Sequence, residues 1–238
     1  MKSQKSKVPP KFLRKFYKVN KSQKYKLKVK NREDKGKIIE FINENESSKV
    51  YNLENEKNKI FLIFLNKSGV SNIKINIGKN VKADILGVII GGKDQTIKLY
   101  TDQEHVKKGG VSNLLVKSVL FDRAQFSYDG LIKIHKGADK SNAYQKNQNL
   151  LMSYNAKAIS RPALEILADD VRCTHGVTVG QLDREQLFYL NSRGLDDPEA
   201  KKLLVLGFLN EVLMRIPDIH IVEKYQKKIL NEVEKYLK

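Results

Sequence analysis

The sequence predicts a mainly β fold over residues 23–178 and a small helical domain over residues 179–238. Short runs rich in β-branched and apolar residues recur from residue 60 onward, separated by turn-forming stretches such as Asn-Lys-Ser-Gly at residues 66–69. No stretch with a helical period lies between these runs, which excludes an alternating βαβ layout. After Gly176 the pattern changes to helix caps and helical periods.

The predicted strands follow one another closely along the chain. Tyr25, Leu27 and Val29 alternate with lysines, which predicts a half-buried strand whose all-lysine outer face is typical of a protected sheet edge. Further strands are predicted over residues 38–42, 60–65, 70–77, 81–90, 96–101, 111–120, 124–127 and 131–135. Closely spaced strands of this kind fit a sandwich, a barrel or a β-helix.

Two features favour the β-helix among these three folds. The sequence contains no Asn-Gly pair of the kind that antiparallel hairpins often use. Residues 60–65 and 84–90 are apolar on both faces, as in sheets that are covered on both sides. Five amide side chains would suit turn-stacking ladders between successive turns of a solenoid; these are Asn142, Gln145, Asn147, Gln148 and Asn149. A strict repeat is not visible, so the periodicity supports this fold only weakly.

Three helices are predicted after residue 179. Asp183 is the cap of the first, which Gly194 ends in a left-handed turn. Asp197 is the predicted cap of the second, with Pro198 at its first helical position, and Pro217-Asp218 opens the third. The second helix, to about Met214, is apolar around most of its circumference, so it must be buried on two sides. The pattern fits contact with another protein as well as ordinary packing inside the domain.

The positive charge is concentrated at one place in the chain. The formal net charge is +18, and residues 1–30 carry twelve Lys or Arg and no Asp or Glu, which leaves 33 basic and 27 acidic residues for the other 208. We interpret residues 1–22 as a basic flexible arm. A basic nucleic-acid-binding β protein is the alternative function, but the arm's aromatic residues do not match a known nucleic-acid motif.

Several classes of protein do not fit the composition. A single cysteine excludes an intramolecular disulfide framework and suits a reducing compartment, so we expect a cytoplasmic protein. No apolar run long enough to span a membrane occurs. The chain lacks common catalytic motifs, and the paired carboxylates Asp169-Asp170 would face opposite sides of a strand, so we do not expect an enzyme.

The cysteine lies two positions from a histidine. In an extended segment Cys173 and His175 project from the same face, where a thiolate and an imidazole form a soft pair of metal ligands. Two ligands are half of a tetrahedral site, and the sequence offers no second pair. Either the site is shared with another chain, or these residues are a packed cysteine and a satisfied strand-end histidine.

Several motifs occur in a fixed order between about residues 121 and 213. They are GLIKI at 130–134, AYQKNQNLLMS at 143–153, RPALEI at 161–166, ADDVRCTHG at 168–176 and LFYLNSRG at 187–194. Together they resemble the C-terminal portion of the SufB/SufD family of iron–sulfur cluster assembly proteins. The upstream strands resemble the family only by type.

The resemblance implies a right-handed parallel β-helix followed by a small C-terminal helical domain. It also implies a non-enzymatic scaffold or partner subunit of a SUF-type complex that docks a SufC-like ABC-type ATPase through its C-terminal helices. The docking residues expected on this basis are Leu187, Phe188, Leu190, Arg193, Leu204 and Phe208. The resemblance further implies pairing with a SufB-like subunit or a second copy through the last turns of the β-helix, with no membrane partner.

The same resemblance implies that an iron–sulfur cluster forms transiently at this subunit junction and that none is bound permanently. Cys173 and His175 match the cysteine and histidine implicated there. In SufB-type chains a glutamate follows the matching histidine, whereas this chain has Gly176, which makes it SufD-like. Family members are also usually longer, with a helical region in place of the basic arm.

Overall fold

The computed structural model describes residues 38–42, 46–54 and 58–237, with side chains described from Ser48 onward. The basic arm and the strand expected at residues 25–29 lie outside these residues. The eleven strands of the described chain are β1 (Ile38–Ile42), β2 (Glu46–Leu53), β3 (Asn58–Leu65), β4 (Gly69–Ile77), β5 (Lys82–Gly91), β6 (Thr96–His105), β7 (Val111–Leu120), β8 (Gln125–Ile134), β9 (Asn142–Leu151), β10 (Lys157–Ile166) and β11 (Arg172–Gly180).

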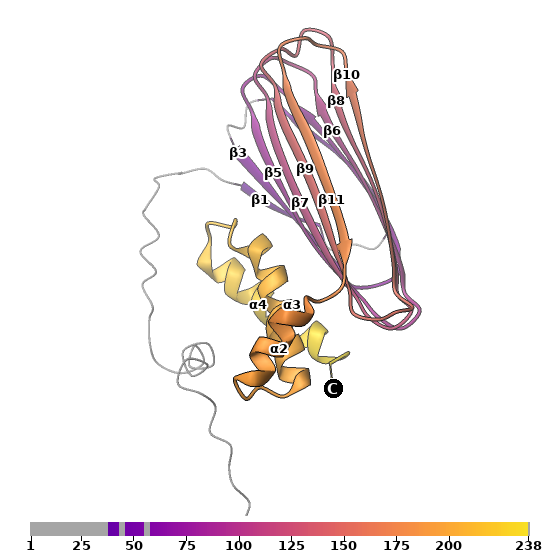
Figure 1. Ribbon diagram of the computed structural model, residues 1–238. Coiled ribbons are helices and arrows are strands. Elements are labelled where there is room, and N and C mark those ends of the chain that lie inside the picture. The colour runs from indigo at the N-terminus through magenta and orange to yellow at the C-terminus, as the bar shows by residue number, and fades with distance from the viewer. Residues whose placement is uncertain (1–37, 43–45, 55–57, 238) are drawn as a thin grey trace, which may run out of the picture.

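The strands form two parallel sheets that face each other (Figure 1). Odd-numbered strands form one sheet in the order β1-β3-β5-β7-β9-β11, and even-numbered strands form the other in the order β10-β8-β6-β4-β2. Each strand pairs in parallel with the strand two places along the chain, because the chain alternates between the sheets as it winds. The fold is therefore a parallel β-helix, as predicted.

The length of one turn changes along the β-helix. In the odd-numbered sheet, Ile38 pairs with Lys59 and Asn58 with Lys82, offsets of 21 and 24 residues. Later pairs join residues 82 to 111, 111 to 142 and 142 to 172, offsets of 29, 31 and 30. Because the early turns are shorter, no single period runs through the sequence.

Two predictions about the strands were wrong. Residues 124–127 and 131–135 are not separate strands, because β8 runs unbroken through Asp129-Gly130. A Cβ atom on Gly130 would lie 2.4 Å from both the Gln145 amide nitrogen and the Tyr128 hydroxyl, so this glycine makes room in the interior and forms no turn. The five amide residues expected in turns lie in strand β9, where three of them point inward.

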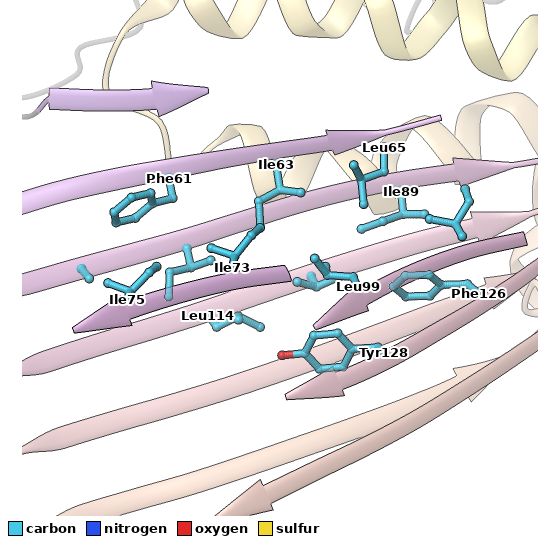
Figure 2. Close-up of a cluster of buried hydrophobic side chains, with 14 of the residues drawn as sticks. Phe61, Ile63, Leu65, Ile73, Ile75, Ile89, Leu99, Leu114, Phe126 and Tyr128 are labelled. Carbon is cyan, nitrogen blue, oxygen red and sulfur yellow. The ribbon is translucent and has the colours of Figure 1, made fainter. Parts of the chain in front are cut away.

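The interior is apolar in the early turns and becomes polar in the later ones. Figure 2 shows Phe61, Ile63 and Ile75 among the apolar side chains packed between the sheets. Further along, buried Thr101 and Tyr128 are hydrogen-bonded at 2.8 Å between their hydroxyl oxygens. Burying these groups is tolerable because they are paired with each other inside the solenoid.

Three helices follow the last strand: α2 (Arg184–Ser192), α3 (Asp197–Leu213) and α4 (Ile219–Glu234). Asp183 and Asp218 cap α2 and α4 by accepting backbone hydrogen bonds, and Gly194 has a positive φ of 92° after α2. The predicted cap of α3 was one residue late. Asp196 accepts the Glu199 amide, since Asp197 and Pro198 already lie within the first turn.

Helices α3 and α4 cover the outer face of the odd-numbered sheet. Val205, Leu209 and Tyr225 are buried in one cluster with outward residues of β3, β5 and β7 such as Leu62 and Leu86. Those strands are apolar on both faces because one face lines the interior and the other meets the helices. The apolar side chains around α3 pack against the sheet, against α4 and against α2.

An ion pair joins the helical domain to the β-helix. The Lys117 amine, on the outer face of β7, donates a hydrogen bond of 2.5 Å to Glu211 of α3 and lies 4.2 Å from the Phe208 ring centroid. The Lys117 side chain is 3% exposed and Glu211 is 46% exposed, so the lysine carries most of the desolvation cost. Burial lowers the pKa of Lys117, and Glu211 opposes that shift.

We expect Glu211→Ala to lower the free energy of unfolding by about 2–3 kcal/mol, because it leaves the buried ammonium of Lys117 unpaired. The double variant Lys117→Met/Glu211→Ala removes that charge and is expected to stay within about 1 kcal/mol of the original chain. Urea unfolding of the three proteins measures both effects. A double variant no more stable than Glu211→Ala would contradict this account.

Candidate functional site

The β-helix ends in two edge strands, β10 and β11. Within the described chain β10 pairs only with β8, and β11 pairs only with β9. One edge of each strand therefore keeps backbone donors and acceptors that no neighbouring strand satisfies. Figure 1 shows β10 and β11 at the same end of the solenoid, one in each sheet.

Several inward-facing side chains of this last turn are exposed. In the even-numbered sheet Leu164 pairs with Ile132 and Ile166 with Ile134; the β8 residues are 0% exposed, whereas the β10 residues are 38% and 42% exposed. In the other sheet, Val177 and Val179 are 37% and 47% exposed above the buried Asn147 and Asn149. The interior of the β-helix is thus open at this end.

Cys173 and His175 lie on the same inward face of β11. Their register partners are Ala143 and Gln145, which are both buried inside the preceding turn. The structure therefore brings the two residues together on one face, as the alternation of strand residues predicts. Cys173 packs partly against a small apolar cluster that includes Ile132, and His175 is exposed. Burial raises the pKa of the Cys173 thiol.

A buried polar network lies directly beneath this open end. The side-chain amide of Gln103 donates to the side-chain oxygen Oε1 of Gln145 at 3.0 Å. The side-chain amide of Gln145 in turn donates to the backbone carbonyl of Gly130 at 3.2 Å. In the same layer Asn149 donates to Asn147 at 2.7 Å. Sequence analysis expected these amides to bond between successive turns of the solenoid, but it placed them in turns and not inside strand β9. The alternation of Ala143, Gln145, Asn147 and Asn149 with longer outward side chains was the signal that could have indicated a strand.

The other titratable candidates do not join the site. His105 is buried and shares a hydrogen bond of 2.9 Å with the Ser112 hydroxyl, and burial lowers its pKa to about 4. His135 pairs with Glu104 on the outer face, and Asp169-Asp170 lies in the turn between β10 and β11. Among the residues described, no three His, Cys, Asp or Glu side chains are grouped so that they could hold a metal ion.

The expected docking residues form two groups in the helical domain, one on the surface and one packed inside. Phe188, which is 74% exposed, and Arg193 lie on the surface of α2, where Arg193 is 5.2 Å from the Tyr189 ring centroid. The others serve packing inside the chain. Leu190 is buried and packs with the partly buried Leu187 and Leu204 between α2 and α3, and the Phe208 ring lies against the Lys117 amine. Sequence analysis missed Tyr189, which is 54% exposed beside Phe188.

Among the described residues, no helix combines the length and the apolar character that crossing a bilayer requires.

Comparison with known proteins finds a family and several relatives. Residues 44–208 match the family model described as SUF system FeS cluster assembly, SufBD core domain. The chain is 36% identical over 141 residues to the iron–sulfur cluster assembly protein SufD of Escherichia coli, covering 59% of this chain and 33% of the relative. It is 34% identical over 161 residues to SufD of Bacillus subtilis, covering 68% and 36%.

A third relative is an iron–sulfur cluster assembly SufBD family protein of Synechocystis, 41% identical over 108 residues, which covers 45% of this chain and 24% of the relative. The chain thus spans between a quarter and just over a third of the length of these relatives. The family match begins upstream of the motifs that carried the resemblance in the sequence and takes in most of the β-helix. Since that match covers well over half of the residues, the chain belongs to the SufBD core family of the SUF iron–sulfur cluster assembly system.

Proposed function

We propose that this chain is a non-enzymatic scaffold subunit of a SUF-type iron–sulfur cluster assembly complex and that it pairs through the open end of its β-helix. The observation that carries the proposal is the exposed interior face of β10 and β11 in a chain of the SufBD core family. As part of the same proposal, the complex works in the cytoplasm, where a reducing environment keeps the single cysteine as a free thiol.

The partner in this pairing is a SufB-like subunit or a second copy of this chain. The end of another β-helix supplies what β10 and β11 lack, namely backbone hydrogen-bond partners along the edge and apolar cover for Leu164, Ile166, Val177 and Val179. Burying exposed apolar side chains of this kind stabilises the associated state, because water is removed from their surface.

The cluster is the cargo of the site and forms transiently at the junction. Cys173 supplies a soft thiolate and His175 an imidazole, and the remaining ligands come from the partner subunit. Because burial raises the pKa of Cys173, this thiol is protonated at neutral pH in the isolated chain, and a bound iron ion favours loss of the proton. Gly176 has no side chain, so any acidic ligand or base at the junction comes from the partner subunit.

We further propose that a SufC-like ABC-type ATPase docks on helix α2. The exposed aromatic pair Phe188 and Tyr189, flanked by Arg193, has the composition of a protein-binding surface. Leu190, Leu204 and Phe208 act indirectly, because their internal contacts hold α2 and α3 in place.

Replacement of Val177 is expected to weaken the proposed pairing strongly. Val177→Asp places a charge on the inward face of β11, where pairing would desolvate it at a cost of about 2–5 kcal/mol, which weakens association by roughly 30-fold or more. The control Thr178→Asp puts the same residue on the opposite face of the same strand. Sedimentation of the assembled subunits measures the effect, and equal behaviour of the two variants would contradict the proposed junction.

Removal of the imidazole is expected to reduce cluster formation. His175→Ala leaves folding unchanged, because His175 is exposed, and lowers the iron and sulfide bound by the reconstituted complex by about tenfold or more. Thr174→Ala, on the other face of β11, is the matched control. A normal cluster yield with His175→Ala would remove this residue from the mechanism.

Disruption of the aromatic surface is expected to prevent ATPase binding. Phe188→Asp changes an exposed side chain and should keep the fold while co-elution with the ATPase is lost. Met214→Asp, at a residue that is 75% exposed beyond the end of α3, tests whether any exposed apolar-to-acidic change has this effect. Retained co-elution with Phe188→Asp would show that α2 is not the docking surface.

A further inference from the structure

The two strand edges at the open end of the β-helix differ in the backbone groups that they present. Successive residues of a strand direct their N–H and C=O groups alternately to its two sides, so every second residue of an edge strand has no neighbouring strand to bond. The strands concerned are β10 and β11, each paired on one side only among the residues that the structure describes. The ladder hydrogen bonds on the paired side identify the free residues on the other side.

On β10, the residues with free backbone groups are those whose side chains point inward. The Lys157 amide donates to Ala124 at 3.0 Å, and the Leu167 amide donates to Ile134 at 2.9 Å, at the two ends of the pairing with β8. Odd-numbered residues of β10 therefore face β8, and even-numbered residues face the free edge. The even-numbered residues are Ala158, Ser160, Pro162, Leu164 and Ile166.

A proline interrupts this edge at its centre. Pro162 has no N–H group, and its ring occupies the space next to which an incoming strand would place a carbonyl group. The fold accommodates proline at this position because residue 162 does not donate to β8. The free edge of β10 keeps donors before and after the gap, but a neighbouring strand cannot follow it without a break.

The free edge of β11 is unbroken. The Arg172 amide donates to Ser141 at 2.9 Å, so even-numbered residues of β11 face β9. The odd-numbered residues then present an uninterrupted run of N–H and C=O groups at the free edge. They are Cys173, His175, Val177 and Val179.

We propose that β11 supplies the continuous backbone ladder of the junction and that Pro162 is a specificity-determining residue, because it prevents β10 from doing so. The occupant of the free edge is the edge strand of another β-helix end, which offers a matching run of backbone donors and acceptors. A carbonyl placed opposite Pro162 would lose water without gaining a hydrogen bond, which opposes a full ladder on β10. This inference rests on the proposed pairing and names the strand that directs it.

The same ladder positions the proposed ligands. The free backbone groups of β11 belong to Cys173 and His175 themselves as well as to the two valines. When a partner strand bonds to these groups, β11 is held by hydrogen bonds on both of its sides instead of one. The thiol and the imidazole are therefore fixed in place by the same event that brings the ligands of the partner subunit.

Proline substitutions on the two free edges test this assignment. Val177→Pro removes a free-edge donor but no hydrogen bond to β9, and Val177→Ala removes the same side chain while keeping the donor. Ala158→Pro makes the equivalent change on β10. Sedimentation velocity of the full chain, alone and mixed with a SufB-like subunit, measures the affinity of the pair that forms.

We expect Val177→Pro to weaken pairing by about tenfold or more relative to Val177→Ala, because a desolvated carbonyl of the partner strand loses its donor. Ala158→Pro should change the affinity by less than about threefold, since the ladder on β10 is already interrupted. Pro162→Ala supplies the missing donor and should tighten pairing by about threefold or more. Urea unfolding of each variant confirms that it is folded.

Hydrogen–deuterium exchange resolved to single residues tests the same assignment without any substitution. In the isolated chain, the amides of Thr174, Gly176 and Thr178 should exchange slowly because they are bonded to β9, whereas those of His175 and Val177 should exchange fast. In the assembled pair both sets should exchange slowly.

Four results would overturn the proposal. These are equal affinities of Val177→Pro and Val177→Ala, equal losses for folded Ala158→Pro and Val177→Pro, no gain for Pro162→Ala, and fast exchange at His175 and Val177 in the assembled pair. In each case a pair still forms, so the proposed scaffold function would stand. Failure of the original chain to pair either with itself or with a SufB-like subunit would contradict both proposals.

Discussion

The parallel backbone ladder between successive turns is the interaction on which the rest of this structure depends. Each interior strand is satisfied by the turns before and after it, so the ladder can stop only by leaving an edge unpaired. At β10 and β11 it stops without any covering element among the described residues, and several inward side chains there stay exposed. The position of Cys173 and His175 follows from this constraint, because they belong to the last strand of the ladder.

The two faces of the odd-numbered sheet show how one set of strands supports two surfaces. Inward residues such as Ile63 and Ile89 build the core, and outward residues such as Leu62 and Leu86 receive α3 and α4. The helical domain is therefore fixed to the same sheet that ends in β11. The pair Lys117–Glu211 contributes to this attachment two strands away from Cys173, since β7, β9 and β11 are neighbours.

Much of this fold could be predicted because its signals are local. The caps at Asp183 and Asp218 follow from side chains that satisfy the first backbone amides of a helix, and the strands apolar on both faces indicated a covered sheet. The alternation at Cys173 and His175 was enough to place both on one face. None of these inferences needs a contact between distant residues.

The features that sequence analysis missed depend on such contacts. Gly130 resembles a turn residue in Asp129-Gly130, but it lies inside β8 because Gln145 from the next turn fills the space of a side chain. The amides of β9 resemble turn residues until their inward partners are known, since Gln145 is satisfied by Gln103, which is 42 residues away. The apolar circumference of α3 was ambiguous for the same reason, because its partners lie on three separate elements.

The central claim is that the open end of the β-helix becomes covered when the chain joins its partner. Hydrogen–deuterium exchange measures this directly, because the edge amides of β10 and β11 exchange freely only while no strand is paired with them. Comparing the isolated chain with the assembled complex should show strong new protection in both strands and none in the interior strands β5 and β7, which are already paired on both sides. Unchanged exchange at β10 and β11 in a complex that carries an iron–sulfur cluster would contradict the account.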